Sequence, residues 1–279
     1  MEIIQSVILG VIQGLAEFLP ISSSGHLILI PRIFSWQDQG LAFDVALHWG
    51  TLIAVLLYFW KDWKKIINES YLLKSIKRKI LSIKQNSDDK FRNTQYLKKD
   101  LLFIIIIATI PGVAAGLLLN NYAETIFRNP VIIAISLFVG ALLLFYSDKI
   151  GAKKTGLANL TLKMGIVIGL FQALAIIPGV SRSGITITIA LLFGMKRMDS
   201  ARFSFLLSTP IILGAGIKEF PNLLESDLNI NIFVGVLVSA ISGYLAIKYM
   251  LKYLENKNYN IFVGYRILLS ILILFFLLF

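Results

Sequence analysis

Residues 101–120, LLFIIIIATIPGVAAGLLLN, form a long apolar run that contains no charged side chain. As an α-helix, a run of this length spans the roughly 30 Å hydrocarbon core of a lipid bilayer. Composition extends this point to the whole chain, because only 15% of its 279 residues are charged, against about 25% in soluble domains. The sequence therefore predicts an all-α integral membrane protein, with residues 1–279 forming a single membrane domain.

Two kinds of apolar segment occur along the chain. Six are uninterrupted and are predicted to be transmembrane helices: residues 41–60, 101–120, 131–147, 203–219, 231–248 and 261–279. Two others, residues 1–30 and 163–195, are broken midway by Pro, Gly and Ser. Irregular backbone at membrane depth is tolerated only where protein or a water-filled cavity surrounds it. We therefore expect each broken segment to be a re-entrant helical hairpin that enters and leaves the membrane on one side.

The connecting loops differ in charge. Residues 61–100 carry twelve Lys or Arg and five Asp or Glu, a net charge of +7. The net charge is +2 in each of the loops 148–160, 196–202 and 248–258, 0 in 120–130 and −2 in 218–230. With six spans and two hairpins, every basic loop lies on one side, which the positive-inside rule makes cytoplasmic. Both termini are then extracytoplasmic, and the basic loops indicate topology rather than a nucleic-acid partner.

The two broken segments resemble each other in sequence. GVIQGLAEFLPISSSG (10–25) and GLFQALAIIPGVSRSG (169–184) align without a gap, with seven of sixteen positions identical. Three spans follow each hairpin, so residues 1–150 and 151–279 are predicted to be two inverted repeats. Inverted repeats with broken helices place their binding site where the repeats meet near the bilayer midplane. The two turns are therefore expected to face each other.

The turns contain two ionisable groups at the predicted membrane depth, Glu17 and Arg182. A charged group there is costly, so we expect these two to be functional, the alternative being a structural ion pair between the repeats. Arg182 lies between Ser181 and Ser183, and a guanidinium with neighbouring hydroxyls is suited to bind phosphate oxygens. Glu17, with the amide oxygen of Gln13 one turn earlier, is suited to hold Mg²⁺ or Ca²⁺.

His26 follows three consecutive serines. Its imidazole titrates near neutral pH, and a serine beside a histidine is the minimum for an activated nucleophile. An anion-binding arginine, a metal-binding carboxylate, a hydroxyl and an imidazole together predict phosphoryl transfer. Asp44 and His48 share one face of the first span, and Arg266 lies in the last span. Asp44 and His48 are expected to support the site or to pair within the bundle, and Arg266 either to pair within the bundle or to lie near a membrane interface.

The serines and glycines of the two turns also have a purely structural interpretation. Ser and Gly in membrane helices commonly allow close helix packing. For Ser22, Ser24 and Ser183, packing and substrate binding remain equally open at this point.

The two polar stretches, QGLAEFLPISSSGHL and PGVSRSGITIT, resemble the two signature regions of the undecaprenyl-diphosphate phosphatase family, the bacitracin-resistance proteins of the bacterial envelope. The first matches (Glu/Gln)-x-x-x-Glu at Gln13 and Glu17, and Ser-Ser-x-Gly-His at residues 22–26. The second matches Pro-Gly-x-Ser-Arg-Ser-x-x-Thr at residues 178–186. Gln13 stands where many family members have Glu, which weakens its expected role as a metal ligand.

The resemblance implies hydrolysis of undecaprenyl diphosphate to undecaprenyl phosphate and inorganic phosphate, with Mg²⁺ or Ca²⁺, in the bacterial plasma (inner) membrane. This reaction recycles the lipid carrier for peptidoglycan synthesis and gives bacitracin resistance. On this basis Glu17, Ser23, His26 and Arg182 are expected to be catalytic and Glu17 and Gln13 to bind metal. Substrate binding is expected from Ser22, Ser24, Gly25, Ser181, Ser183, Gly184 and Thr186.

The expected reaction has Ser23 attacking the terminal phosphorus while His26 takes its proton. Attack by His26 itself or by water fits the same residues. A type-2 phosphatidic acid phosphatase is excluded, because that family needs a second histidine and none follows Arg182.

The alternative from another class is a lipid-phosphate transporter or flippase that uses the same anion-binding site. A flippase has no need of a proton-transfer pair, so Glu17 and His26 favour the enzyme. The sequence does not decide the prenyl chain length, the metal, or between a monomer and a homodimer.

Overall fold

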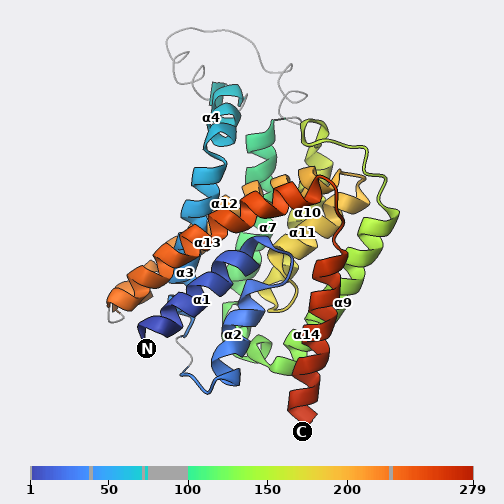
Figure 1. Ribbon diagram of the computed structural model, residues 1–279. Helices are drawn as coiled ribbons and strands as arrows, with labels where there is room; N and C mark the ends of the chain where they lie inside the picture. The colour runs from blue at the N-terminus through green and yellow to red at the C-terminus, as the bar shows by residue number, and fades with distance from the viewer. Residues whose placement is uncertain (1, 38–39, 71–72, 75–99, 226–228, 279) are drawn as a thin grey trace, which may run out of the picture.

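A computed structural model describes residues 2–37, 40–70, 73–74, 100–225 and 229–278. Within these ranges the chain is helical, and its only β-type pairing is an isolated bridge between Thr155 and Met195. The six long helices are α3 (Gly40–Tyr58), α7 (Leu101–Leu118), α9 (Pro130–Ile150), α12 (Arg197–Glu225), α13 (Ile230–Leu254) and α14 (Asn260–Leu278), shown in Figure 1. The shorter elements are α1 (Ile3–Phe18), α2 (Ser23–Ile33), α4 (Trp60–Glu69), α8 (Asn120–Glu124), η1 (Ile126–Arg128), η2 (Leu157–Asn159), α10 (Leu162–Gln172), η3 (Ala173–Ile176) and α11 (Arg182–Leu192).

The six long helices are apolar and long enough to cross a membrane, which confirms the six predicted spans. Their outward faces expose large apolar side chains, among them Leu118 at 80% and Phe276 at 73% of the full surface. Water would disfavour apolar surface of this extent, whereas lipid accepts it. The chain is therefore a multi-pass membrane protein.

Several predicted loops are largely helical instead, including residues 120–130 in α8 and η1 and residues 218–225 in α12. Helix α12 already begins at Arg197, and α13 continues to Leu254. Residues 196–202 and 248–258 were expected to connect spans, but most of them extend the helices. Long basic side chains at a helix end can keep their charged groups in the interfacial water, so their presence does not end a helix.

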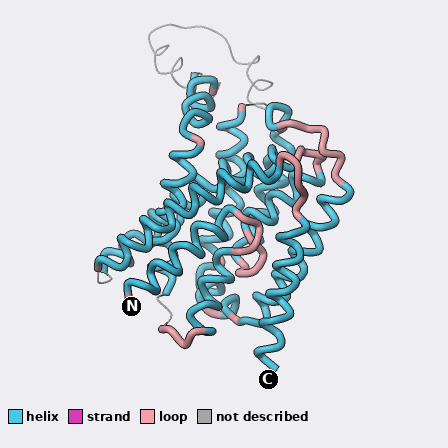
Figure 2. Tube along the Cα trace, viewed as in Figure 1, coloured by secondary structure: helices cyan, strands magenta, loops and turns pink. Residues whose placement is uncertain are grey.

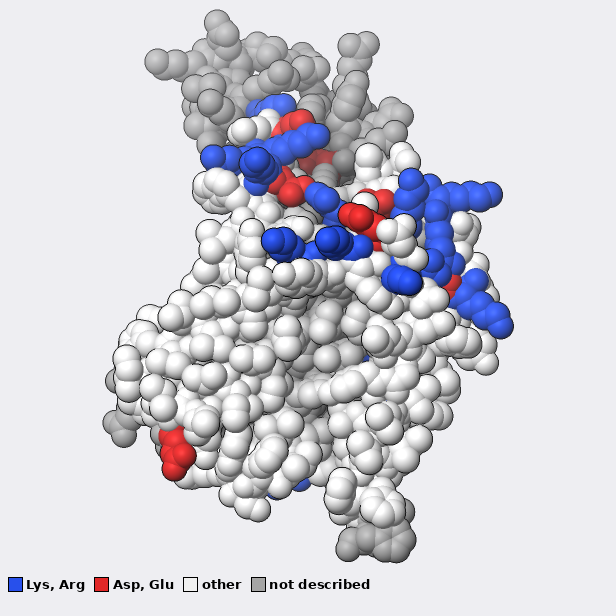
Figure 3. Space-filling view, viewed as in Figure 1, with Lys and Arg blue, Asp and Glu red and all other residues white. Residues whose placement is uncertain are grey.

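The charges are concentrated at one end of the molecule. Figure 3 shows Lys and Arg gathered over the upper part of the surface, near α4, above a broad uncharged face. The two chain ends lie at the opposite end (Figure 1). Most of the predicted basic loop 61–100 lies outside the described residues, which include only α4 and residues 70, 73–74 and 100 of that range.

Each broken apolar segment is a pair of short helices joined by a turn, α1 to α2 and α10–η3 to α11. Figure 2 shows loop segments in the middle of the bundle as well as at its ends. Ser22 and Ser181 precede α2 and α11 with positive φ values of 76° and 69°. Positive φ is uncommon for residues other than glycine. The serine side chains compensate by accepting hydrogen bonds from the Gly25 and Gly184 N–H groups, which caps the helices.

Close backbone contacts hold the short helices against the spans. Helix α1 packs on α13, where a side chain at Gly10 would lie 2.6 Å from the Gly235 carbonyl oxygen. Helix α10 packs on α7, where a side chain at Gly169 would overlap the Ala108 backbone. Small residues allow such approach in membrane proteins, where helix association depends on packing rather than on water exclusion. The turns that follow α1 and α10 are thereby placed in the interior.

Candidate active site

The two turns lie against each other and are joined by reciprocal hydrogen bonds. The Ser22 hydroxyl of the first turn accepts from the Gly179 N–H of the second at 3.0 Å. The Ser183 hydroxyl, which follows the second turn, donates to the Leu19 carbonyl of the first at 3.2 Å. These contacts satisfy backbone groups that neither helix can satisfy by itself. Residues more than 150 positions apart therefore contribute to one interior site.

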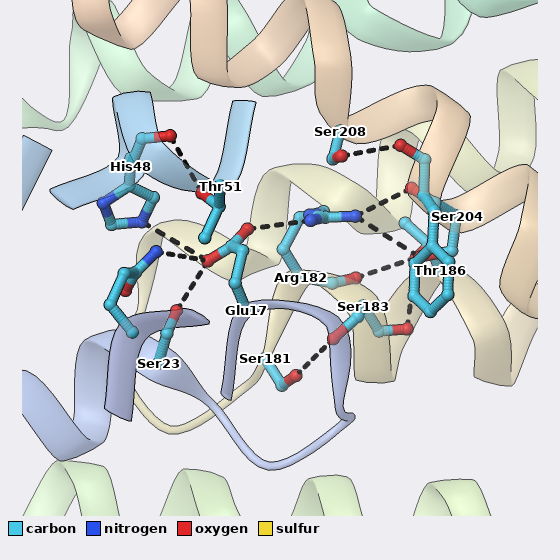
Figure 4. A network of polar contacts seen from close by, with 12 residues as sticks. Glu17, Ser23, His48, Thr51, Ser181, Arg182, Ser183, Thr186, Ser204 and Ser208 are labelled. Atoms are coloured by element: carbon cyan, nitrogen blue, oxygen red, sulfur yellow. Dashed lines mark hydrogen bonds and ion pairs between the residues drawn. The ribbon is translucent and has the colours of Figure 1, made fainter. Parts of the chain in front are cut away.

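The Glu17 carboxylate is the centre of this site (Figure 4). Its Oε1 accepts a hydrogen bond from Arg182 Nη2 at 2.8 Å, and its Oε2 accepts one from the Ser23 hydroxyl at 2.7 Å. Gln13 Nε2 donates to Oε2 at 3.2 Å, and His48 Nε2 lies 3.4 Å from the same oxygen. Glu17 is buried, so this set of partners replaces the water that an ionised carboxylate requires. The Ser23 hydroxyl thus points its proton at a carboxylate.

The Arg182 guanidinium is fixed from two sides. Opposite Glu17, its Nη1 donates to the Ser204 carbonyl oxygen of α12 at 2.7 Å. Thr186 hydrogen-bonds with the Ser204 hydroxyl at 2.7 Å and donates to the Arg182 carbonyl oxygen at 2.8 Å. The Arg182 Nε is buried and has no hydrogen-bond partner among the described residues. This N–H is therefore an unsatisfied donor that the surrounding protein encloses.

A cavity of about 340 Å³ lies beside these groups. Glu17, Ser23 and Arg182 line one end of it, and its lining continues along α7 and α12 as far as Asn120 and Lys218. The intervening wall is mostly apolar. Side chains at Gly116 of α7 and Gly214 of α12 would meet nothing within 4 Å, so these glycines leave the cavity open. A polar end and a long apolar wall suit an amphipathic ligand with an anionic head.

Comparison with known proteins identifies the family of the chain. The family model described as "Bacitracin resistance protein BacA" matches residues 6–272. The chain belongs to this family. A protein of Moorella thermoacetica is 46% identical over 273 residues, which cover 98% of this chain and 97% of the relative. One of Saccharophagus degradans is 48% identical over 272 residues, covering 97% and 96% of the two chains. One of Alcanivorax borkumensis is 45% identical over 280 residues, covering 99% and 100%. All three are named undecaprenyl-diphosphatase.

The structure places the predicted catalytic residues in two groups. Glu17, Ser23 and Arg182 come together, with the predicted metal ligand Gln13 hydrogen-bonded to Glu17. His26 does not join them. Its Nδ1 pairs with the Ser22 carbonyl oxygen at 2.7 Å and its Nε2 with the Tyr265 hydroxyl at 2.6 Å.

The expected proton transfer from Ser23 to His26 is not supported by this arrangement, because both nitrogens of that imidazole have other partners. The proton acceptor beside Ser23 is the Glu17 carboxylate.

The predicted substrate-binding residues also separate. Ser22, Ser24 and Ser181 line the cavity, although the hydroxyls of Ser22 and Ser181 already cap helices. Four others lie outside the cavity lining and have structural contacts. These are Ser183 on Leu19, Thr186 on Ser204, Gly25 against Ser22 and Ile133, and Gly184 against Arg266. The contact of Ser183 with Leu19 favours the packing alternative for this residue.

The sequence singled out His48 as a residue that supports the site or pairs within the bundle, but it did not indicate its contact with Glu17 or the contribution of Ser204. His48 approaches Glu17 from α3, with its Nδ1 held by the Asp44 carbonyl oxygen at 2.6 Å. A histidine within an apolar span was the available signal. Ser204 is the middle one of three serines spaced four residues apart, with Ser200 and Ser208, and all three are fully buried. That spacing puts them on one helix face, which indicates a polar stripe directed inward.

The donor set near Glu17 suits a hard divalent cation. Besides the carboxylate, the Gln13 Oε1 is buried without a hydrogen-bond partner among the described residues. Mg²⁺ and Ca²⁺ take oxygen ligands, and Mg²⁺ is commonly bound by one or two protein oxygens together with substrate phosphates. No cluster of three or more His, Asp or Glu side chains occurs in the described part of the chain.

Proposed function

We propose that this chain is an integral membrane phosphatase that hydrolyses undecaprenyl diphosphate to undecaprenyl phosphate and inorganic phosphate. The contact that carries the proposal is the 2.7 Å hydrogen bond from the Ser23 hydroxyl to Glu17, next to Arg182 at the polar end of an apolar cavity. The names of its relatives support the same activity. The reaction recycles the lipid carrier of peptidoglycan synthesis and gives resistance to bacitracin.

In the proposed reaction, the guanidinium of Arg182, a residue that lines the cavity, binds the terminal phosphate. The Ser23 oxygen attacks the terminal phosphorus, and its proton passes to Glu17. The bond between the bridging oxygen and this phosphorus breaks, and undecaprenyl phosphate leaves. Glu17 gives the proton to the departing undecaprenyl phosphate and is ionised again. Water then attacks the phosphoserine with Glu17 as its base, and Glu17 returns this proton to the Ser23 oxygen as inorganic phosphate leaves. His48 and Gln13 hold the carboxylate in place throughout.

Direct attack by water uses the same base and the same anion site. Attack by His26 has no support, because Tyr265 and Ser22 occupy its two nitrogens. Glu17 and Gln13 would hold Mg²⁺ or Ca²⁺, which supplies positive charge against the diphosphate when bound. A lipid-phosphate transporter would use Arg182 but has no need of a serine directed at a carboxylate, so the geometry favours hydrolysis.

The proposal includes the finer architecture. The pairs α1–α2 and α10–α11 act as re-entrant hairpins of two inverted repeats, residues 1–150 and 151–279. Two observations support this. The aligned residues Ser22 and Ser181 have nearly the same φ and cap their helices in the same way. The aligned glycines Gly10 and Gly169 contact α13 and α7, each the second span of the opposite repeat.

The orientation follows from charge. Residues 120–130 and 218–230 are neutral or acidic and are expected outside the cytoplasm, as are both termini. The cavity reaches Asn120 and Lys218, which lie in these two segments. This supports a site that opens to the outer face of the bacterial plasma (inner) membrane.

The test is release of inorganic phosphate from undecaprenyl diphosphate by the protein purified in detergent, with and without EDTA. The comparison is between the wild type, Arg182→Ala and Arg202→Ala. Arg202 is a matched control because it too is an arginine near the start of a helix, in this case α12, and pairs with a carboxylate, Asp62, outside the cavity lining.

Release that requires metal, is lost in Arg182→Ala and persists in Arg202→Ala supports the proposal. A folded wild type that releases no phosphate from several prenyl diphosphates overturns it and leaves lipid-phosphate transport.

A further inference from the structure

Arg266 of α14 is the largest side chain in the described chain that is fully buried. Its guanidinium donates five hydrogen bonds, and every acceptor is a backbone carbonyl oxygen. The acceptors and distances are Leu137 at 3.2 Å, Ser136 at 3.4 Å, Pro20 at 3.2 Å, Gly179 at 2.9 Å and Val180 at 3.0 Å. Among the described residues no carboxylate pairs with Arg266. Burying a cation without a carboxylate partner costs free energy. We therefore expect the guanidinium to stabilise the backbone segments whose carbonyl groups accept its hydrogen bonds.

The five acceptors belong to three segments. Pro20 lies in the first turn, Gly179 and Val180 lie in the second, and Ser136 and Leu137 lie in α9. One planar guanidinium thus joins both turns and ties them to a membrane span. Arginine suits this role because its donors lie in a fixed plane and diverge, whereas a lysine offers a single nitrogen.

Two glycines leave space for the guanidinium. A Cβ at Gly140 of α9 would overlap Arg266 Nη2. A Cβ at Gly184 of α11 would lie 2.7 Å from Nη1. The position of the Arg266 side chain is therefore determined by the surrounding backbone and not only by its own hydrogen bonds.

The neighbouring residue has a related contact. The Tyr265 hydroxyl pairs with His26 of α2 at 2.6 Å, and the two rings stack with centroids 5.6 Å apart. Consecutive residues of α14 therefore hold the first turn through Pro20 and the helix that follows it through His26. This contact gives His26 a structural role, which is to hold α2 against α14.

We infer that Arg266 is a positioning residue that sets the spacing between Ser23 and Arg182. Pro20 lies three residues before Ser23, and Val180 lies two residues before Arg182. The nucleophile and the anion-binding guanidinium are thus carried by the two backbone segments that Arg266 joins. The inference rests on the proposed function, because it assigns a purpose to the spacing of these two side chains.

The test compares Arg266→Met, Arg266→Lys and Gly140→Ala with the control Gly264→Ala. Gly140→Ala keeps the arginine but displaces it. Gly264 lies two residues before Arg266 on the same helix, and a Cβ there would meet nothing within 4 Å. A displacement of about 1 Å between reacting groups costs on the order of 10²-fold. We expect a fall of that order in kcat for Arg266→Met and Gly140→Ala, and a smaller fall for Arg266→Lys.

The Michaelis constant separates positioning from general damage. Arg182 and the cavity remain, so KM should stay within about threefold of the wild type while kcat falls. Unchanged kcat in the folded Arg266 and Gly140 variants overturns the inference, and so does an equal loss in Gly264→Ala. If the wild type itself releases no phosphate, the proposed function fails. The wild-type assay therefore distinguishes that failure from a failure of the inference about Arg266.

A second readout does not depend on activity. The chain contains no cysteine, so Ile33→Cys and Leu192→Cys add unique labelling sites at the exposed ends of α2 and α11. Spin labels there report the distance between the two helices that follow the turns. Arg266→Met should broaden or shift the measured distance distribution, and Gly264→Ala should leave it unchanged. An unaltered distribution in Arg266→Met contradicts the inferred role.

Discussion

The change Glu17→Gln tests the role of the carboxylate with little change in shape. Glutamine keeps the volume of the side chain but removes its charge and its ability to take the Ser23 proton. General-base catalysis contributes about 10²–10⁴-fold to a rate, so kcat for phosphate release should fall by a factor in that range. Binding through Arg182 should be affected less than kcat, because its guanidinium and its contact with Ser204 remain.

The same change has a calculable effect on stability. Arg182 loses its 2.8 Å charged partner but keeps the 2.7 Å hydrogen bond to the Ser204 carbonyl oxygen and borders the cavity. The loss should therefore be about 1.5–3 kcal/mol, the value of a hydrogen bond to a charged group. A fully buried cation without any remaining partner would cost about 3–5 kcal/mol. Thermal or denaturant unfolding in detergent measures the difference from the wild type.

A matched control exists elsewhere in the chain. Asp148 is also a buried carboxylate and accepts from Arg197 Nε at 2.6 Å, but it does not border the cavity. Asp148→Asn should destabilise the protein comparably and leave kcat of the folded enzyme unchanged. If Glu17→Gln retains kcat within about threefold of the wild type, the carboxylate is not the base, and the reasoning from its contact with Ser23 is refuted.

Three further predictions follow from single contacts. His48→Ala removes one neighbour of Glu17, worth about 1.5–3 kcal/mol, so kcat/KM should fall by roughly 10–100-fold, and unchanged kinetics would exclude a role for His48. Gly214→Leu fills open space in the cavity wall, so KM for undecaprenyl diphosphate should rise without loss of stability; unchanged KM would place the lipid elsewhere. Tyr265→Phe removes the hydrogen bond to His26, which should lower the unfolding free energy by about 0.5–1.5 kcal/mol, and a more stable variant would contradict this contact.

Much of the fold was predictable because the bilayer imposes strict requirements. A helix that spans the bilayer must form its backbone hydrogen bonds within itself and must be apolar over its length. The apolar run at residues 101–120 meets both requirements and was therefore readily predicted as a span. Helix ends were less predictable. The first residues of α12 are basic but still helical, because charge at an interface does not oppose helix formation.

The residues of the site were found more readily than their roles. Glu17 and Arg182 were recognised because a charged group at membrane depth is energetically costly and is therefore expected to be functional. The direction of the His26 side chain could not be predicted, because nearness in sequence to Ser23 does not determine where a side chain points. In the structure Ser23 points to Glu17, whereas His26 points to α14. The histidine that approaches Glu17 comes from α3, and that long-range contact depends on helix packing.

The hydroxyl of Ser23 as the attacking group is the central claim of this account. Its most direct measurement is rapid quenching of the purified enzyme with undecaprenyl diphosphate labelled in the terminal phosphate, followed by peptide mapping. The account predicts label on Ser23 as an acid-stable, alkali-labile phosphoserine that is absent in Ser23→Ala, which should also release no phosphate. Label on His26, or full phosphate release by Ser23→Ala, would contradict it.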